Sequence, residues 1–414
     1  MNLKISNLPK AVVLISIAVA ACLLGDAMLY AVMPSSPQTW GLSTSAVALM
    51  LSANRFIRLA SNPMAAILFK KFGKHKTLIF ALSLSVYVTM IYGWSTAFFL
   101  LITARIFWGI AFSILRLGTQ ITVFEETEES NRGFMMGISL GIMRMGNIFG
   151  AILGSISVQG FGHRTTLTGF AAAIVVTSVA WLMGTTIGKQ EKIQKPTALL
   201  DQESMLSQFK LIFYEKKITL FLIASFLTGL IFPGLMWSTT GFYLYESFGN
   251  DIIIVGLTIG VVSLTGLILG IQWSLVLPIA PLVGRASDHY GRIKVIICGL
   301  LLGTIGLTIL AITSAIFFSL LGIVLSFIAG IILAVVLPTT IGEIAGESKR
   351  AAALSVYATC ADLGSGIGPI IGLSFGNLFL LKGIFIFSAF LLVSTALIIR
   401  LAFRDTIFVS TNHK

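Results

Sequence analysis

Long apolar stretches and short polar connections alternate along the whole chain. Twelve apolar stretches reach about 20 residues, the length that crosses a bilayer as a helix. They lie near residues 11–33, 46–69, 75–94, 98–123, 134–158, 165–187, 218–244, 252–283, 293–312, 315–341, 351–380 and 383–402. Six fall in each half, so the pattern predicts an all-α integral membrane protein with twelve transmembrane helices.

The two halves carry the same local motifs at one constant offset of 218 residues. The matched sets are Phe72-Gly73-Lys74 with Tyr290-Gly291-Arg292, Glu125 and Arg132 with Glu343 and Arg350, and Gly146, Gly150 and Gly154 with Gly364, Gly368 and Gly372. A register kept over three separate landmarks indicates a duplicated six-helix unit. We therefore expect two pseudo-symmetric six-helix bundles, residues 1–187 and 218–414, joined by a cytoplasmic tether at residues 188–217.

Basic residues concentrate in alternate loops. Of the 28 lysines and arginines, 21 lie in the termini or in even-numbered loops, whereas odd-numbered loops hold only Arg164 and Lys382. The positive-inside rule then puts both termini in the cytoplasm, in a plasma membrane or bacterial inner membrane. The same rule accounts for the net charge of +12 without a nucleic-acid partner. The chain contains 56% hydrophobic and 11% charged residues. We therefore expect its outer surface to contact membrane lipid.

The loop after the eighth predicted helix carries a recognisable motif. Its sequence, Gly284-Arg-Ala-Ser-Asp288-His-Tyr-Gly291-Arg292, resembles the signature loop of the major facilitator superfamily of secondary transporters. That family carries the loop after both the second and the eighth helix. Here the first copy is degraded, with Lys70 at the place of Asp288. The resemblance implies a gating role for the loop, and we assign Glu343 and Arg350 to the same group.

Two further motifs resemble the same family. Arg105 precedes Gly109 by four residues, as in the family's fourth helix, and Gly364, Gly368, Pro369 and Gly372 match its glycine-proline pattern. The first-half copy has Ala151 where the proline would stand. In the family that proline marks exporters, so its absence argues against export. The resemblance implies a monomeric transporter that works by alternating access, without enzymatic activity or a cofactor.

Seven ionisable residues lie well inside the predicted membrane helices. They are Asp26, Arg55, Arg58, Arg105, Arg116, Arg144 and Asp362. Each such charge costs at least ~2.5 to 3.5 kcal/mol at a helix centre, so the protein must pair it or use it. Five arginines exceed two aspartates by three positive charges. The excess indicates an anionic solute, because the guanidinium fork suits carboxylate and phosphate.

Helical spacing places these arginines on shared faces. Arg105 and Arg116 are eleven residues apart, which puts them within roughly 20° of one face and ~16 Å apart along the axis. Arg55 and Arg58 lie one turn apart. Two alternatives remain open. Arg116 could pair with the acidic run at Glu125, Glu126, Glu128 and Glu129, and Arg144 could be a structural partner of a backbone carbonyl or an acid.

The repeat relates Arg144 to Asp362 and Arg55 to Trp273, next to Gln272. The resemblance implies that the second helix packs against the eleventh and the fifth against the eighth. Asp362 would then face Arg55 or Arg58, while Arg144 would face Gln272 and Trp273. We also include Tyr30 among the candidate substrate-binding residues, since its ring could shape a pocket.

Energy coupling must use a carboxylate if protons drive transport. All four histidines, at positions 75, 163, 289 and 413, lie in loops or the tail. The carrier would then be Asp26, held between desolvation and a nearby Arg105, or Asp362. We expect proton symport, with uptake of a carboxylate, a carboxylate siderophore, or a phosphorylated or sulfonated metabolite.

Other functions remain as alternatives. A proton-coupled exporter of drugs or lipophilic cations would need a net acidic cavity, and a transport-dead receptor or sensor would share the fold. The sequence lacks a G-x-x-x-x-G-K-[ST] loop, which argues against an ATP-driven pump. Its three cysteines lie in predicted helices without metal-ligand spacing, so we expect no metal.

Overall fold

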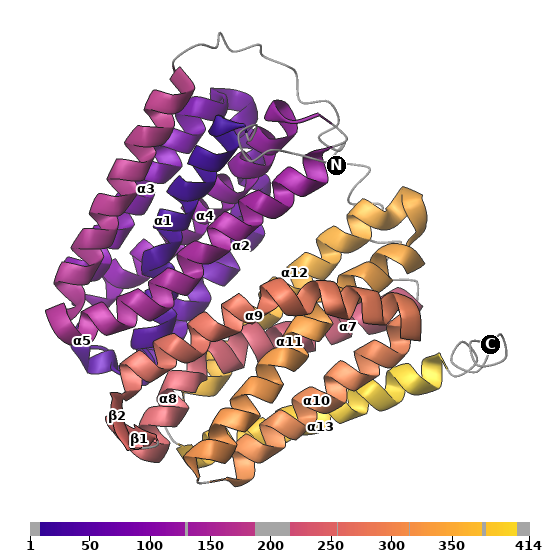
Figure 1. The fold of residues 1–414 in the computed structure, drawn as a ribbon. Coiled ribbons are helices and arrows are strands. Elements are labelled where there is room, and N and C mark those ends of the chain that lie inside the picture. Colours follow the sequence, from indigo (N-terminus) through magenta and orange to yellow (C-terminus); the bar gives the residue numbers. More distant parts are fainter. Residues whose placement is uncertain are drawn as a thin grey trace. The chain divides into compact units, whose positions relative to one another are not determined.

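The computed structural model describes residues 9–128, 131–186, 216–254, 256–313, 315–374 and 378–403, and these are helical apart from one β-hairpin and short connections (Figure 1). The first half contains α1 (Lys10–Val32), the 3₁₀ turn η2 (Pro37–Trp40), α2 (Thr44–Phe72), α3 (Lys74–Trp94), α4 (Phe98–Glu126) and α5 (Arg132–Thr186). The second half contains α7 (Lys216–Gly229), η4 (Leu230–Met236), α8 (Trp237–Phe248), β1 (Asp251–Ile254), β2 (Leu257–Gly260), α9 (Val261–Tyr290), α10 (Arg292–Ile312), α11 (Ile316–Ile344), α12 (Gly346–Leu373) and α13 (Leu378–Ala402). The predicted all-α membrane architecture is confirmed.

Ten helical stretches within the described ranges are long and apolar enough to cross a membrane. The long helix α5 covers two predicted spans, which meet at Gly162, where φ is 79° and the helix breaks. A positive φ is readily adopted only by glycine, so Gly162 marks the turn between them. The helix α2 is not among the ten, because Asn54, Arg55 and Arg58 lower its hydropathy. Counting both parts of α5 and including α2 gives the twelve predicted helices.

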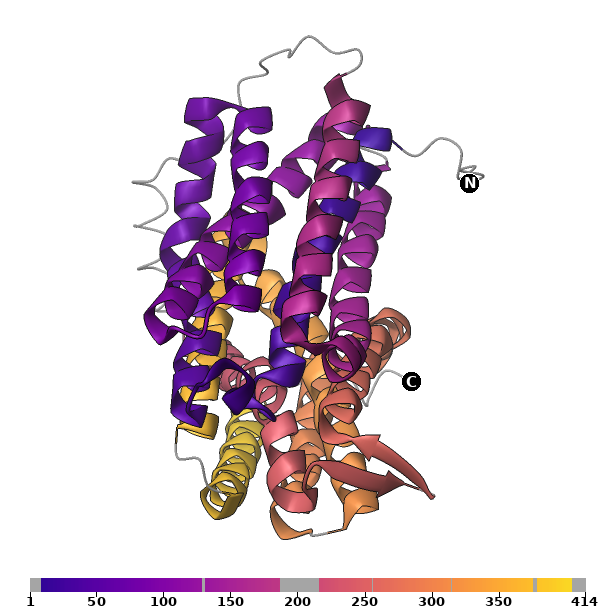
Figure 2. The same cartoon turned by 90° about the vertical axis from the view of Figure 1, so that its left-hand side faces the viewer.

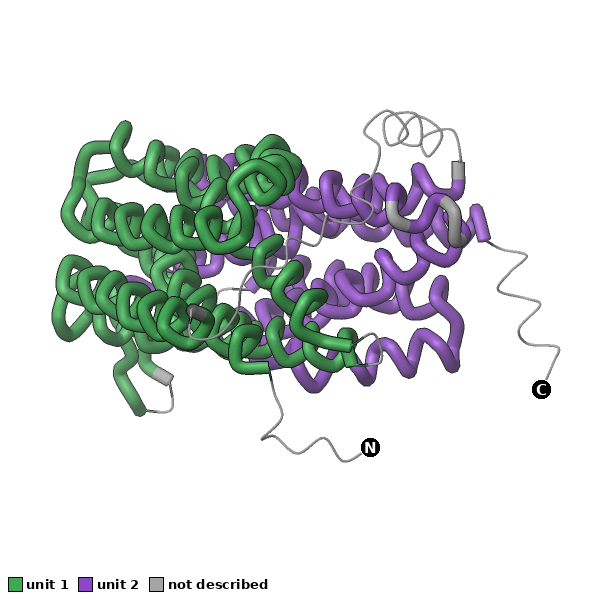
Figure 3. Tube along the Cα trace, turned by 90° about the horizontal axis from the view of Figure 1, so that it is seen from above, with its two compact units in different colours: residues 1–197, 250–273 green, residues 198–249, 274–414 purple. Residues whose placement is uncertain are grey.

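Two compact units divide the chain (Figure 3). Unit 1 comprises residues 1–197 and 250–273, and unit 2 comprises residues 198–249 and 274–414. The β-hairpin and the first half of α9 therefore belong with unit 1. Much of the predicted tether lies outside the described residues, so the division at 188–217 stays a prediction.

The contact between α5 and α9 explains this membership. Ser263 Oγ on α9 lies 2.5 Å from Gln159 Oε1 on α5. One turn further along α9, a Cβ built on Gly266 would lie 2.4 Å from the carbonyl oxygen of Ala151. The two helices therefore touch through their backbones, and α5 packs against the eighth predicted helix as the family resemblance implies.

The hairpin corrects one sequence prediction. The apolar pattern predicts that residues 252–260 begin a helix, but β1 and β2 pair antiparallel there (Figure 2). Ile252 lies opposite Ile259. Consecutive β-branched isoleucines favour a strand, because their χ1 is restricted in a helix. Gly256, with φ of 80°, lies in the turn. The transmembrane helix starts only at Val261.

Glycines bring α1 and α5 into backbone contact in unit 1. A Cβ built on Gly146 would lie 2.2 Å from the carbonyl oxygen of Ala20, and one on Gly150 would lie 2.4 Å from that of Leu24. No side chain fits into these spaces. Small residues at such spacing allow membrane helices to approach closely. We call this contact of α1 with α5, made at Gly146 and Gly150, the first glycine seam.

Unit 2 repeats this seam between α12 and the first helix of its own half. A Cβ built on Gly364 would lie 2.1 Å from the carbonyl oxygen of Phe226, and one on Gly368 would lie 2.5 Å from the backbone of Gly234. The positions are those that the 218-residue offset predicts. The sequence repeat therefore corresponds to one helix contact made once in each unit.

The segment η4 interrupts this helix of unit 2 with a turn of π-helix around Pro233. Proline has no N–H and cannot continue the α-helical hydrogen-bond ladder, so the winding widens locally. Phe232 beside it packs onto two helices of the same unit: a Cβ on Gly303 of α10 would lie 2.7 Å from its ring, and one on Gly330 of α11 would lie 3.0 Å from its Cβ. The π-helix is thereby fixed in the core of unit 2.

Candidate functional site

A buried salt bridge joins α4 to α1 in unit 1. Arg105 Nη1 lies 2.5 Å from Asp26 Oδ1, with the arginine side chain fully buried and the aspartate side chain 17% exposed. Arg105 Nε donates a further hydrogen bond of 3.2 Å to the carbonyl oxygen of Met50 on α2. The second terminal nitrogen, Nη2, is buried and makes no hydrogen bond with any described residue. Nη2 is thus an unsatisfied donor enclosed within unit 1.

Two tyrosine rings enclose the same guanidinium. The Cζ atom of Arg105 lies 5.6 Å from the ring centre of Tyr30 and 5.9 Å from that of Tyr92. Cation–π attraction of this kind stabilises a desolvated arginine. Tyr30 was predicted as a site residue, whereas Tyr92 on α3 was missed. In the sequence, Tyr92 is marked only by being a tyrosine within an apolar span.

The helices α2 and α4 pack closely at the next turn of α4. A Cβ on Gly109 would lie 2.2 Å from Ile57 Cγ2, which explains why a glycine follows Arg105 by four residues. The hydroxyls of Ser61 and Ser113 hydrogen-bond at 2.7 Å across the same contact. This packing holds α2, and with it Arg55 and Arg58, in a fixed rotation against α4.

Arg58 and Arg55 differ in their surroundings. Arg58 is buried, with its Cζ 5.6 Å from the ring centre of Phe112 on α4, while Arg55 is half-buried. Asn54, which the sequence analysis missed, is buried beside them, and its Oδ1 accepts no hydrogen bond from the described residues. Arginine donors and an amide acceptor therefore occur together on α2.

The other predicted residues of unit 1 lie on α4, α5 and α9. Arg116 is exposed and Arg144 is half-buried. Gln272 and Trp273 are buried in the first half of α9, and Gln272 Oε1 lacks a hydrogen bond within the described part of the chain. The predicted contact between Arg144 and Gln272 stays a prediction.

Asp362 is the predicted carboxylate of unit 2. It is half-buried on α12, and its carbonyl oxygen accepts a hydrogen bond of 3.0 Å from Ser365 Oγ. Its predicted pairing with Arg55 or Arg58 remains untested.

Equivalent ion pairs join neighbouring helices at one end of each unit. Lys74 at the start of α3 binds Glu125 at the end of α4. At the same offset, Arg292 at the start of α10 lies 2.8 Å from Glu343 at the end of α11 and 2.7 Å from Asp288 on α9. The degraded first copy of the signature loop has therefore kept its basic residue and its acidic partner.

The remaining signature residues support the second of these pairs. Gly291, with φ of 92°, forms the turn between α9 and α10, and Gly284 lies on α9 one turn before Asp288. Arg350 Nε donates a hydrogen bond of 3.2 Å to the carbonyl oxygen of Gly342, next to Glu343. The predicted gating residues are thus neighbours, and their role in gating stays a prediction.

Comparison with known proteins agrees with this architecture. A family model described as Major Facilitator Superfamily matches residues 15–277 and 265–414. The nucleoside transporter NupG has a TM-score of 0.77 and 14% identity, covering 95% of this chain and 99% of its own. A bacterial homolog of the human lysosomal transporter Spinster, inward-facing and occupied, has a TM-score of 0.75 and 12% identity, covering 95% and 96%.

A third similar structure is a POT family transporter in complex with 5-aminolevulinic acid. It has a TM-score of 0.74 and 14% identity and covers 96% of this chain and 97% of its own. No curated protein matched the sequence. At these identities the structural likeness supports the fold alone.

Proposed function

Since the chain belongs to the Major Facilitator Superfamily, we propose that it moves a small organic anion across the membrane by alternating access. It is a multi-pass integral membrane protein with the fold of the transporters described above. The finer proposal concerns the solute and the coupling ion.

The excess of positive charge inside unit 1 carries the proposal. All five intramembrane arginines lie in this unit, and its intramembrane carboxylate, Asp26, is already bound to Arg105. Counted over the seven intramembrane residues, five arginines and two aspartates give an excess of three positive charges. Arg58 and Arg105 are buried, Arg55 and Arg144 are half-buried, and Arg116 is exposed. Charges inside a membrane are costly, and an arriving anion would offset part of the cost of the buried ones.

The surroundings of Arg105 favour a carboxylate or phosphate group. Its buried Nη2 lacks a hydrogen bond within the described residues, and the rings of Tyr30 and Tyr92 keep the guanidinium in place. Arginine offers two parallel donors to a planar or tetrahedral oxyanion. A POT family transporter of the same fold holds 5-aminolevulinic acid, which is consistent with a small acid as solute.

Asp26 is our candidate for the proton carrier. Its side chain is partly exposed and reaches the buried guanidinium of Arg105. A proton on Asp26 would remove its charge and free Arg105 to bind the anion, so proton and solute would load together. Release of the solute would restore the salt bridge once the proton leaves. This order of events gives symport, and a proton gradient directed into the cell would make it uptake.

A thermal-shift screen of the purified protein tests the solute class. Each carboxylate or phosphate is compared with its neutral amide or alcohol analogue at equal concentration. A ligand that binds only the folded state raises stability by RT ln(1 + [L]/Kd). We expect stabilisation by anions alone. Equal stabilisation by cations or neutral analogues would reject an anionic solute, and flux into proteoliposomes would then establish which solute is moved.

A further inference from the structure

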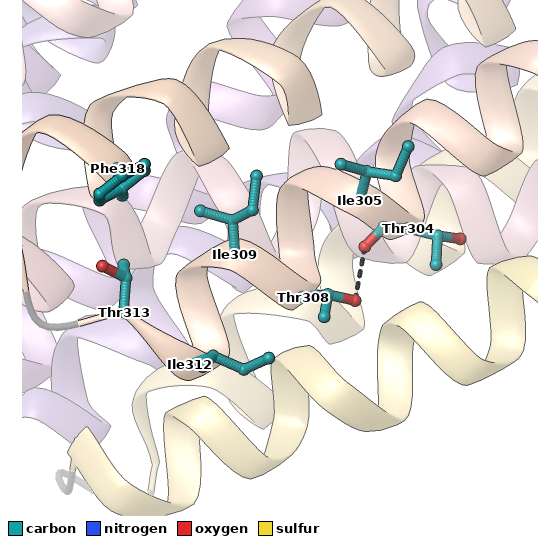
Figure 4. A pocket seen from close by; sticks show the side chains of 7 residues that line it. All are labelled: Thr304, Ile305, Thr308, Ile309, Ile312, Thr313 and Phe318. Carbon is teal, nitrogen blue, oxygen red and sulfur yellow. Dashed lines mark hydrogen bonds between the residues drawn. The ribbon is translucent and has the colours of Figure 1, made fainter.

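Each unit carries an apolar groove at the same place. The first groove, of about 490 Å³, is lined by Tyr87, Met90, Ile91, Trp94, Ser95 and Leu100 of α3, α4 and the turn between them. The second groove, of about 450 Å³, is lined by Ile305, Thr308, Ile309, Ile312, Thr313 and Phe318 of α10, α11 and the turn between them (Figure 4). Adding 218 to each of the six residue numbers of the first set gives the second set. The duplicated unit has therefore kept a groove in both copies.

Both grooves face outward on membrane-spanning helices. Trp94 is 60% exposed and Ile312 is 74% exposed. In the second groove the hydroxyl of Thr308 donates to the carbonyl oxygen of Thr304 at 2.8 Å (Figure 4). The hydroxyl of Thr304 donates in turn to the carbonyl oxygen of Leu300 at 3.0 Å. These hydroxyls are satisfied by their own helix, so the groove needs no water and suits a hydrocarbon chain.

A single basic residue lies at the end of each groove. Lys382 Nζ of α13 donates a 3.0 Å hydrogen bond to the carbonyl oxygen of Thr313. Arg164 of α5 lies with its Cζ 5.9 Å from the ring centre of Trp94. The same offset of 218 relates Arg164 to Lys382. These two are also the only basic residues of the odd-numbered loops.

A purely structural role does not explain both residues. Lys382 could simply satisfy a carbonyl at the end of α10, but Arg164 contacts an indole ring instead. What the two copies share is a positive charge at the mouth of an apolar groove. Positive charge beside a hydrocarbon slot matches an amphiphile with an anionic head.

We propose that each groove binds one anionic phospholipid, with an acyl chain along the groove and the phosphate at Arg164 or Lys382. Lys382 uses one of its three N–H donors on Thr313, so donors remain for a phosphate. The sites lie at the opposite end of α3 and α10 from Lys74 and Arg292, which is the outer leaflet in the predicted orientation.

Lipid titration of the purified full chain, followed by native mass spectrometry, tests the proposal. The probes are phosphatidylglycerol, phosphatidylcholine with the same chains, and free glycerol phosphate. We expect two retained phosphatidylglycerol molecules in the wild type, one fewer in Lys382→Gln or Arg164→Gln, and two fewer in the double variant. Each lost charge should weaken one site about fivefold. Lys382→Arg and Arg164→Lys should bind as the wild type does.

Groove-filling variants separate the hydrocarbon from the head group. Thr308→Trp and Met90→Trp keep the charges and should each lose one lipid, and they carry the test if a glutamine variant does not fold. Arg400→Gln, at the other end of α13 and exposed, is the matched control and should lose none. Equal retention of phosphatidylcholine, competition by glycerol phosphate alone, or unchanged lipid number in the double variant would each overturn the proposal.

Discussion

Arg105 Nη1 on α4 and Asp26 Oδ1 on α1 lie 2.5 Å apart, in a pair whose arginine is completely buried. The pair links the helix that carries the first glycine seam to the helix that packs on Arg58. We expect both the folding of unit 1 and the proposed binding of an anion to depend on this contact.

The first prediction concerns its contribution to folding. Asp26→Ala or Arg105→Ala alone leaves an uncompensated charge inside the unit and should cost about 3 to 5 kcal/mol of unfolding free energy. The double variant Asp26→Leu with Arg105→Met should be more stable than either alanine variant. Thermal unfolding in detergent measures all three. A double variant less stable than both singles would show that the pair is not the dominant interaction.

The second prediction concerns anion binding. Arg105→Ala, Arg55→Ala and Arg58→Ala should each lose a charged hydrogen bond to the solute, worth about 1.5 to 3 kcal/mol, or roughly 10- to 150-fold in Kd. The lysine variants keep the charge but lose the fork, so they should also bind more weakly. Arg400→Ala is the control. Wild-type Kd in all three alanine variants, by titration calorimetry, would exclude these arginines from the site.

The third prediction concerns coupling. Asp26→Asn cannot exchange a proton, so accumulation driven by an imposed pH gradient should stop, while solute exchange between equal pools should remain measurable. Proteoliposome uptake with and without the gradient separates the two activities. Wild-type accumulation by this variant would transfer the role to Asp362 or indicate a uniporter.

The fourth prediction concerns Asp362. If this carboxylate pairs with Arg55 in one state of the transport cycle, either alanine variant should lose stability or activity, and the charge swap Asp362→Arg with Arg55→Asp should recover part of it. Arg58 provides the parallel swap. Unfolding temperature and flux are measured together. The proposed pair would be ruled out if neither charge swap has a higher unfolding temperature or flux than the worse of its two single variants.

The fifth prediction concerns the glycine seams. Gly150→Ala and Gly364→Ala place a methyl group within about 2.1 to 2.4 Å of a carbonyl oxygen, so the helices must separate, at a cost of roughly 1 to 3 kcal/mol. Gly141→Ala lies on the same helix as Gly150 with nothing within 4 Å and serves as the control. Equal unfolding temperatures for Gly150→Ala and Gly141→Ala would contradict the observed packing.

Sequence patterns predicted the helices and the repeat because both depend on local signals. Apolar length marks a span, and Gly146 with Gly364 marks the register of the two copies. The same signals misassigned residues 252–260, since an apolar run of isoleucines fits a helix or a strand equally well. The antiparallel pairing of β1 with β2 distinguishes the two.

The site was only partly predictable. Arg105 and Asp26 stood out as charges in apolar helices, and a charge inside a membrane is informative by itself. Tyr92 and Asn54 did not stand out, because their importance depends on the rotation of α3 and α2. A helix that is apolar on all sides carries no pattern that reveals which face meets its neighbour.

Arg144 and Asp362 occupy the same position in the two copies of the repeat, yet they carry opposite charges. A homodimer of two identical six-helix chains must carry the same residue at this position in both chains, because its twofold axis maps each residue onto the same residue of the other chain. Joining the copies in one chain removes that requirement. The two halves of this protein could therefore diverge in charge at this position, while the contact of Lys74 with Glu125 in one half and that of Arg292 with Glu343 in the other stayed equivalent.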